Sequence, residues 1–145
     1  MNDMKTKLKV FTSTIAVLVG LHFAACTADT NGPSRVSVDR NINVAIYATH
    51  ENGDTIETVL PALMKETVRI SELVQYPGDD RMTMPFYLSD TTVYAEITEK
   101  NIGKRIAIGI NGKIMSTPVV KMRIGNGACS VPLDSIQTHA LFPSL

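Results

Sequence analysis

Three short stretches of this sequence hold residues of the kinds that bind metal ions. His50-Glu51-Asn52-Gly53-Asp54 has ligand-type side chains, but it lacks the alternating carboxylates and the closing Glu of a calcium-binding EF-hand loop. A solvated hairpin turn accounts for it more simply, because an Asn-Gly pair suits positive φ angles. Asp79-Asp80 follows Pro77-Gly78 and indicates another solvated turn, while His139 indicates a surface or packing residue. We therefore expect no metal site.

Residues that suit nucleophilic catalysis or cofactor binding are present without the surrounding pattern. Ser116 and Ser130 lie within strand patterns, and the sequence has no Gly-x-Ser-x-Gly nucleophile turn. Gly125-x-Gly127 lacks the third glycine and the following helix of a dinucleotide-binding turn. Cys129 has no neighbouring His in the sequence to activate it, so we expect a small thiol buried in the core. The sequence predicts no catalytic residue, no cofactor and no enzyme activity.

The overall composition excludes two further classes of protein. The chain has 145 residues, enough for one ordinary domain, and its 14 Lys and Arg balance its 14 Asp and Glu. Nucleic-acid binding needs surplus positive charge and aromatic stacking surfaces, and this neutral chain has no Trp, so we expect no nucleic-acid partner. Two cysteines are too few for a disulfide scaffold.

The N-terminal residues have the pattern of a secretory signal. Met1–Lys9 carries three Lys against one Asp, and Val10–Ala25 then has no formally charged residue. A helix over Val10–Ala25 would be about 24 Å long, short of the roughly 30 Å hydrocarbon core of a bilayer. We therefore expect a cleaved signal peptide over residues 1–25 rather than a membrane-spanning anchor.

Cys26 gives this signal a second feature. Ala24-Ala25-Cys26 resembles a bacterial lipobox, with Phe23 in the place where Leu is usual. The resemblance implies cleavage before Cys26 and attachment of lipid to its sulfur and its new amino group, which would anchor the chain to a membrane. An ordinary signal cut elsewhere, with Cys26 as a chance thiol, is the alternative. Residues 26–40 begin with small and polar side chains, and we expect them to form a lipidated, flexible tether.

Removal of residues 1–25 changes the charge balance. The remaining 120 residues have lost three Lys and one Asp, so the mature chain carries a net charge of −2. Residues 41–145 are expected to form its single domain.

The first part of that domain gives mixed signals. Asn41–Thr49 alternates apolar and polar residues and predicts a strand, and residues 51–54 predict a turn. Residues 55–75 are ambiguous, because the apolar residues between 59 and 64 have helical spacing whereas Val68–Ile70 favours a short strand. Helix and strand both remain open for this stretch.

The signals are clearer after residue 80. Residues 82–88 alternate and predict a strand, and Asp90 is a good N-cap for a helix over residues 91–101. Residues 104–122 contain two strand patterns on either side of Asn111-Gly112, a strong signal for a hairpin turn.

A last strand is expected at residues 128–131, and the tail from Asp134 is expected to add a short helix. The chain would then have four to six strands and two or three helices. This order predicts an α+β fold, with a mainly antiparallel sheet and two or three helices packed on one face.

The stretch from Ile97 to Val120 resembles one protein family. It is similar to the head subdomain of the first periplasmic domain of SecD/SecDF, a protein-translocation accessory subunit. In that family a helix ends in Thr-x-x-Asn-x-Gly-Lys, and an Ala-Ile strand, an Asp-Gly turn and a Ser-Ala-Pro-Val strand follow. Tyr94 stands where the family carries an aromatic residue. The other matching positions are Thr98, Asn101, Gly103, Lys104, Ala107, Ile108, Gly112, Ser116, Pro118 and Val119.

The resemblance spans Leu88–Val131 and is incomplete. Asn111 and Thr117 replace the Asp and the Ala of the family pattern, and Gly125-Asn126-Gly127 splits its Gly-Gly pair. The tail after Ser130 is also shorter than the family's closing helix.

The resemblance implies a non-catalytic binding or interaction module on the periplasmic side of a membrane. In the SecD family the proton-driven work belongs to membrane helices, and no further apolar segment after the signal suggests one here, so a translocation motor is not expected. We expect a membrane-anchored envelope lipoprotein that binds an envelope or exported protein by a sheet edge or face, as an accessory to protein export or envelope assembly. A small-ligand-binding or enzymatic protein using residues around His50, and a structural envelope component, are the alternatives.

Overall fold

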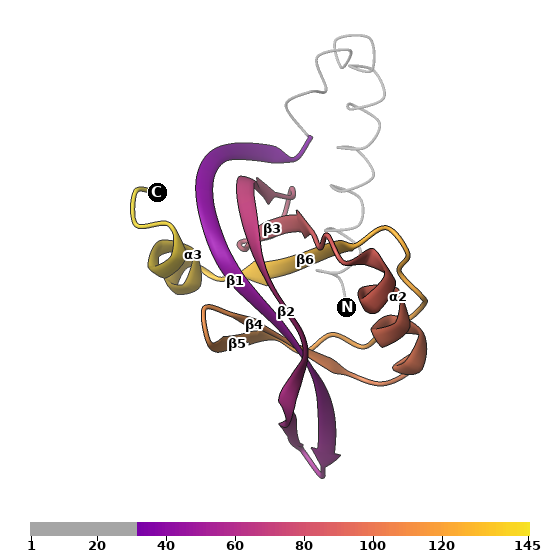
Figure 1. Ribbon diagram of the computed structural model, residues 1–145. Helices are drawn as coiled ribbons and strands as arrows, with labels where there is room; N and C mark the ends of the chain where they lie inside the picture. The colour runs from indigo at the N-terminus through magenta and orange to yellow at the C-terminus, as the bar shows by residue number, and fades with distance from the viewer. Residues whose placement is uncertain (1–31) are drawn as a thin grey trace, which may run out of the picture. The chain divides into compact units, whose positions relative to one another are not determined.

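The computed structural model describes residues 32–145, which form a six-stranded sheet and two helices (Figure 1). The strand order is β5-β4-β1-β2-β3-β6, and all neighbouring strands are antiparallel. The predicted signal peptide, Cys26 and the first part of the predicted tether lie outside the described residues. The elements are β1 (Ser34–Asn52), β2 (Thr55–Gln75), β3 (Met82–Tyr87), α2 (Thr91–Lys100), β4 (Ile106–Ile110), β5 (Lys113–Ser116), β6 (Ala128–Leu133) and α3 (Ser135–Leu141).

β1 is longer than the strand that the sequence predicts at residues 41–49. It begins at Ser34 and pairs with β2 from its first residue, with Ser34 opposite Gln75. Its inward residues alternate with exposed polar ones, as in the run Ile42, Asn43, Val44. The predicted strand therefore exists as the central part of β1.

The predicted α+β fold with two or three helices packed on one face is wrong. Residues 55–75, whose apolar spacing suggested a helix, form the 21-residue strand β2. The spacing misleads because the pairing with β1 slips: Ala48 lies opposite Val59, but Ile46 lies opposite Met64. Four residues of β2 thus face a single residue of β1, and this irregularity breaks the two-residue period of a strand.

The two helices that do form are short and lie apart, instead of side by side on one face (Figure 1). Within residues 32–145, neither is long and apolar enough to cross a bilayer. Both begin where the sequence predicts, after Asp90 and Asp134. The Asp134 carboxylate accepts a hydrogen bond from the Gln137 N–H at 2.8 Å, and the Gln137 side chain accepts one from the Asp134 N–H at 3.0 Å.

β1 and β2 extend beyond the rest of the sheet as a two-stranded projection (Figure 1). β4 pairs with β1 only over Val44–Ala48, and β2 pairs with β3 only where Val74 meets Thr83. The hairpin continues outward to the predicted turn, where Asn52 pairs with Thr55. We call residues 49–63 the arm. In the described part of the chain, no third strand pairs with either edge of the arm.

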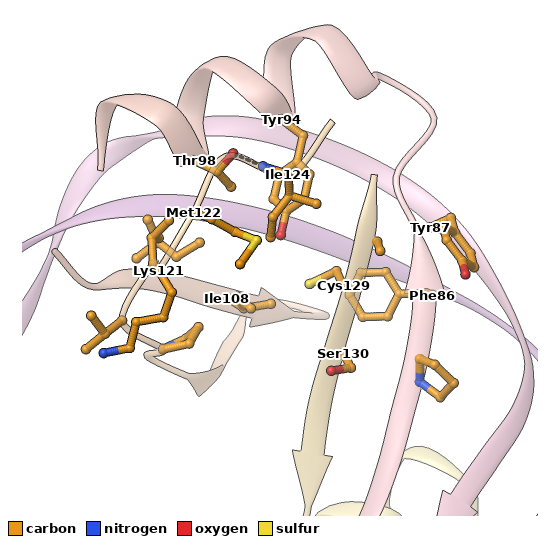
Figure 2. Close-up of a pocket in the computed structure, with 16 residues that line it drawn as sticks. Phe86, Tyr87, Tyr94, Thr98, Ile108, Lys121, Met122, Ile124, Cys129 and Ser130 are labelled. Atoms are coloured by element: carbon orange, nitrogen blue, oxygen red, sulfur yellow. Dashed lines mark hydrogen bonds between the residues drawn. The ribbon is translucent and has the colours of Figure 1, made fainter. Parts of the chain in front are cut away.

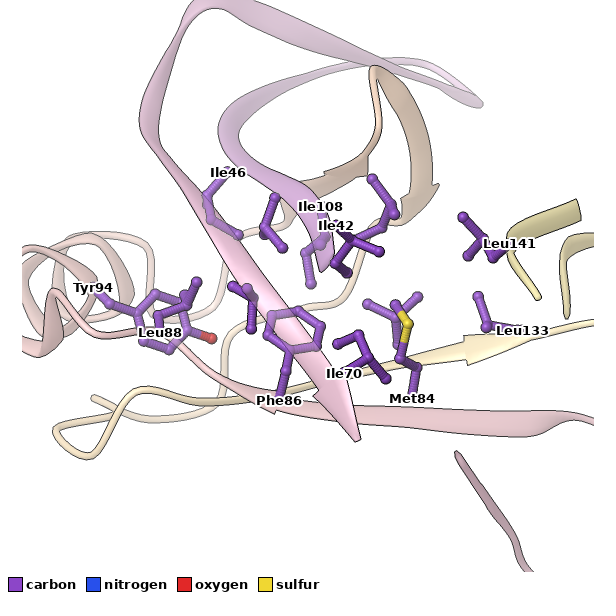
Figure 3. Close-up of a cluster of buried hydrophobic side chains, with 14 of the residues drawn as sticks. Ile42, Ile46, Ile70, Met84, Phe86, Leu88, Tyr94, Ile108, Leu133 and Leu141 are labelled. Carbon is purple, nitrogen blue, oxygen red and sulfur yellow. The ribbon is translucent and has the colours of Figure 1, made fainter. Parts of the chain in front are cut away.

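The core lies between the β1–β2–β4 part of the sheet and the ribbon formed by β3 and β6 (Figure 3). Burial of this apolar surface is the main favourable contribution to folding. Its most deeply buried members come from these strands and from the residue that follows β3, and are Ile42, Val44, Ile46, Ile70, Leu73, Met84, Leu88, Ile108, Ile110, Val131 and Leu133.

Two carboxylates fix the start of α2. Asp90, the predicted N-cap, accepts a hydrogen bond from the Val93 N–H at 3.1 Å. Glu66 of β2 accepts one from the Ser89 N–H at 2.7 Å and another from the Asp90 N–H at 3.4 Å. Partial burial opposes ionisation of Glu66, but these hydrogen bonds outweigh it and lower the pKa of Glu66 below its ordinary value. The resulting stabilisation is present at neutral pH and is lost as the pH falls through that lowered pKa.

The predicted hairpin at Asn111-Gly112 joins β4 to β5. Asn111 has φ +50° and Gly112 φ +84°, which suits the tight turn that this pair favours. β5 ends at Ser116, so the predicted return strand is confirmed in its first residues only. Residues 118–124 continue as an irregular segment with isolated bridges at Val119 and Val120.

Gly127 stands where the chain enters β6 and passes close to the end of β3. It has φ +75°, and its carbonyl accepts a hydrogen bond from the Leu88 N–H at 2.9 Å. A Cβ atom at position 127 would lie 2.2 Å from the Leu88 carbonyl oxygen. Only glycine fits this approach without displacing the backbone.

We expect Gly127→Ala to lower the free energy of unfolding by about 2 kcal/mol or more, because the backbone must move to relieve the clash. Gly53→Ala is a matched control, since Gly53 also has a positive φ of +62° but no atom within 4 Å of the added Cβ. The control should lose only about 1 kcal/mol of strain. Chemical denaturation of the purified chain measures both, and equal losses would contradict the close approach.

Candidate functional site

An open apolar groove of about 470 Å³ lies between the β3–β6 ribbon on one side and α2 with residues 118–124 on the other (Figure 2). β4 contributes Ile106 and Ile108 to it. Lys121 is the one formally charged residue in the lining of this groove. The principal apolar lining residues are Phe86, Tyr94, Ile106, Ile108, Val120, Met122, Ile124 and Cys129.

The ribbon wall of the groove is a regular antiparallel pair. β3 and β6 pair from Met82 opposite Leu133 to Tyr87 opposite Ala128, which sets Phe86 opposite Cys129. Phe86 is buried, whereas Tyr87 is 69% exposed. The wall therefore offers aromatic surface both inside the groove and at its mouth.

The opposite wall, residues 118–124, has little regular secondary structure but is firmly tied by its backbone. The Gly103 N–H donates to the Val120 carbonyl at 2.8 Å, and the Val120 N–H donates to the Lys104 carbonyl at 2.9 Å. The Ile106 N–H donates to the Pro118 carbonyl at 3.1 Å. Met122 lies beyond these ties and is 66% exposed.

Thr98 of α2 ties the far end of this wall to the helix. Its side chain is fully buried, and its hydroxyl accepts a hydrogen bond from the Ile124 N–H at 2.9 Å (Figure 2). The same hydroxyl donates to the Ala95 carbonyl at 3.0 Å. Thr98 is one of the residues that match the SecD/SecDF pattern. Its two hydrogen bonds give a structural reason for a threonine at this position.

Cys129 and Tyr94 meet within the groove. Burial raises the pKa of the Cys129 thiol to about 11, although hydrogen bonding to Tyr94 and to the Ser130 backbone acts in the opposite direction. Burial, together with the neighbouring Cys129, raises the pKa of Tyr94. Cys129 is partly exposed and packs against the core, so the predicted core thiol lies at the edge of the core and lines the groove. Both groups are neutral at physiological pH.

Of the cations in the groove lining or next to it in sequence, both arginines are ion-paired. Arg105 makes an ion pair with Glu51 of the arm at 3.4 Å, and Arg123 makes one with Glu99 at 3.7 Å. For Lys121, the described part of the chain offers no carboxylate within 4.0 Å.

The metal-type residues seen in the sequence do not converge. His50 is exposed on the arm, and His139 is on α3. Asp79 lies in the loop after β2, where it makes an ion pair with Arg81 at 3.1 Å. Within residues 32–145, no three His, Cys, Asp or Glu side chains are placed to hold a metal ion.

Sequence reasoning missed the groove, although it singled out some of the lining residues, Cys129 and Ser130 for their chemistry and Tyr94, Thr98, Ile108, Pro118 and Val119 for the family resemblance. The lining comes from five separate stretches of the chain, and each stretch alone has the pattern of an ordinary strand, helix or loop. One available signal was charge, because Lys100–Leu133 contains six Lys and Arg and no Asp or Glu.

Neither a protein-family model nor a curated protein matches this chain. Among solved structures, the chain is similar to one of SecDF, described as a membrane component that enhances protein export, with a TM-score of 0.45 and 17% identity. The match covers 70% of this chain and 59% of the SecDF chain. SecDF belongs to the family that Leu88–Val131 resembles in sequence. At this TM-score the likeness concerns the general course of the chain, and it says nothing of activity or partners.

We expect Thr98→Val to lower the free energy of unfolding by about 1 to 3 kcal/mol, because the substitution leaves the Ile124 N–H without its partner. Thr138→Val is a matched control, because the buried Thr138 hydroxyl has no hydrogen-bond partner among the described residues. This control should be neutral or stabilising. Chemical denaturation of both variants measures the difference, and equal effects would show that the Thr98 hydrogen bond contributes nothing.

Proposed function

We propose that this chain is a membrane-anchored envelope lipoprotein whose folded part is a non-catalytic binding module for segments of other proteins. Its role would be that of an accessory to protein export or envelope assembly. The observation that carries the binding role is the groove, which is apolar inside, open to solvent and lined by a single charged residue, Lys121.

The exposed side chains at the mouth of the groove favour a protein segment as the occupant. Tyr87 and Met122 each keep about two thirds of their surface exposed. A partner that covers them removes apolar area from water, which favours formation of a complex. The flexible thioether of Met122 adapts to side chains of different shape. Pockets for small molecules instead enclose most of the ligand surface.

The envelope location and the export role rest on the sequence. Ala24-Ala25-Cys26 supports lipid attachment, and the SecD/SecDF pattern within Leu88–Val131 supports a module on the periplasmic face of a membrane or on the outer membrane. A lipid anchor would hold the groove near the membrane surface, where exported polypeptides emerge.

The groove can be tested through the accessibility of Cys129. Because burial raises the pKa of this thiol to about 11, its alkylation should be slow at neutral pH and should quicken as the pH rises. The full chain in phospholipid nanodiscs is mixed with a short extended peptide of alternating Leu and Glu, and alkylation of Cys129 is followed by mass spectrometry. Binding in the groove should slow the reaction severalfold.

Met122→Asp should remove this protection, because a carboxylate at the mouth disfavours both apolar contact and an acidic peptide. Ile136→Asp is the matched control, since Ile136 on α3 is 79% exposed and lies outside the groove. The control should keep the protection. A peptide that never slows alkylation, or that protects the Met122→Asp variant equally, would rule out binding in the groove.

Lipid attachment is tested separately in bacterial cells fed an alkyne analogue of palmitate. The wild-type protein should take up the label and sediment with membranes. Cys26→Ala should lose the label and leave the membrane fraction, whereas Cys129→Ala should keep both properties because that thiol is not the predicted anchor. Labelled Cys26→Ala protein would end the lipoprotein proposal.

A further inference from the structure

Two stretches of this nearly neutral chain each carry charge of one sign only. Asn41–Met64, which includes the arm, contains three acidic residues and no Lys or Arg. Lys100–Leu133, which supplies much of the groove and its rim, contains six Lys and Arg and no acidic residue. Two surfaces of opposite sign on one molecule attract the complementary surfaces of another copy.

The arm also exposes apolar side chains that nothing in residues 32–145 covers. Leu60 is 75% exposed, and Ile56, Val59 and Leu63 are each more than a third exposed. They lie on a two-stranded hairpin whose outer edges are unpaired in the described part of the chain. Exposed apolar residues beside free strand edges are typical of a surface that another polypeptide covers.

The groove has the properties that such an arm requires of a partner. Its interior is apolar, and Lys121 stands in its lining without a carboxylate within 4.0 Å among the described residues. The ion pair of Arg105 with Glu51, at 3.4 Å, shows that the basic region already attracts an acid of the arm. Glu57, which lies opposite His50 on β2, makes no ion pair with the residues described.

We propose that the arm of one copy of this chain docks into the groove of a second copy. Leu60 and its apolar neighbours enter the groove, and Glu57 faces Lys121 at the rim. The inference rests on the proposed function, because it names a second copy of this chain as an occupant of the same groove. The two surfaces differ, so the contact is head-to-tail and leaves one arm and one groove free for further copies.

Two full-length copies with different epitope tags are produced together in a bacterial envelope, both carrying Cys129→Ser so that only the engineered thiols react. One copy carries Leu60→Cys and the other Met122→Cys, and a mild oxidant is added. A disulfide-linked species with both tags is expected. Its yield should exceed by at least about fivefold that of the control pair Leu60→Cys with Ile136→Cys, a partner position that is even more exposed than Met122.

Charge reversal tests whether the arm and the rim recognise each other. Glu57→Lys in the copy that offers the arm, or Lys121→Glu in the copy that offers the groove, should each lower the yield by about threefold or more. Both reversals together should restore it, because the attractive pair is re-formed with its signs exchanged. Added salt should weaken the wild-type crosslink.

Equal yields for the Met122 and Ile136 pairs would overturn this inference. A disulfide yield that neither charge reversal lowers would also overturn it. Capture of a different envelope protein by Leu60→Cys in place of the tagged copy would also overturn it. Peptide protection of Cys129 is measured independently. If that protection persists without the mixed-tag disulfide, self-association is wrong and the proposed function stands; if the protection is absent, the proposed function fails as well.

Discussion

The antiparallel pairing of β1 with β2 runs from Ser34 opposite Gln75 to Asn52 opposite Thr55, and the rest of the fold is attached to it. β4 pairs with β1, which places the floor of the groove. Glu66 of β2 holds the N-terminus of α2, which places one wall. The same hairpin continues outward as the arm. One long pairing therefore positions both surfaces that the proposed interactions use.

Charged residues and apolar surface are distributed differently on this molecule. The chain as a whole is close to neutral, yet Asn41–Met64 carries three acidic residues and no Lys or Arg, whereas Lys100–Leu133 carries six Lys and Arg and no acidic residue. One polar contact of the groove is the hydrogen bond that the Thr98 hydroxyl accepts from the Ile124 N–H. In such an arrangement the apolar surface supplies affinity. The charges at its edge select the orientation of a partner and the sign of the partner's charge.

The second half of the fold could be predicted from the sequence because its signals are local. Asp90, Asn111-Gly112 and Asp134 each specify a cap or a turn through their own hydrogen bonds or φ angles. Residues 55–75 could not be assigned, because a slip in the pairing with β1 imitates helical spacing. The groove could not be predicted either. Its lining comes from stretches that are far apart in the sequence, and no single stretch indicates that they pack together.

β2 pairs with β3 at one position only, where Val74 meets Thr83, so the β3–β6 ribbon is attached to the remainder mainly by side chains. Apolar packing is non-directional, whereas a backbone ladder fixes strands in register. The two walls of the groove therefore belong to bodies with separate hydrogen-bond ladders. The width of the groove therefore depends on how well the side chains between its two walls pack, more than on a continuous backbone ladder.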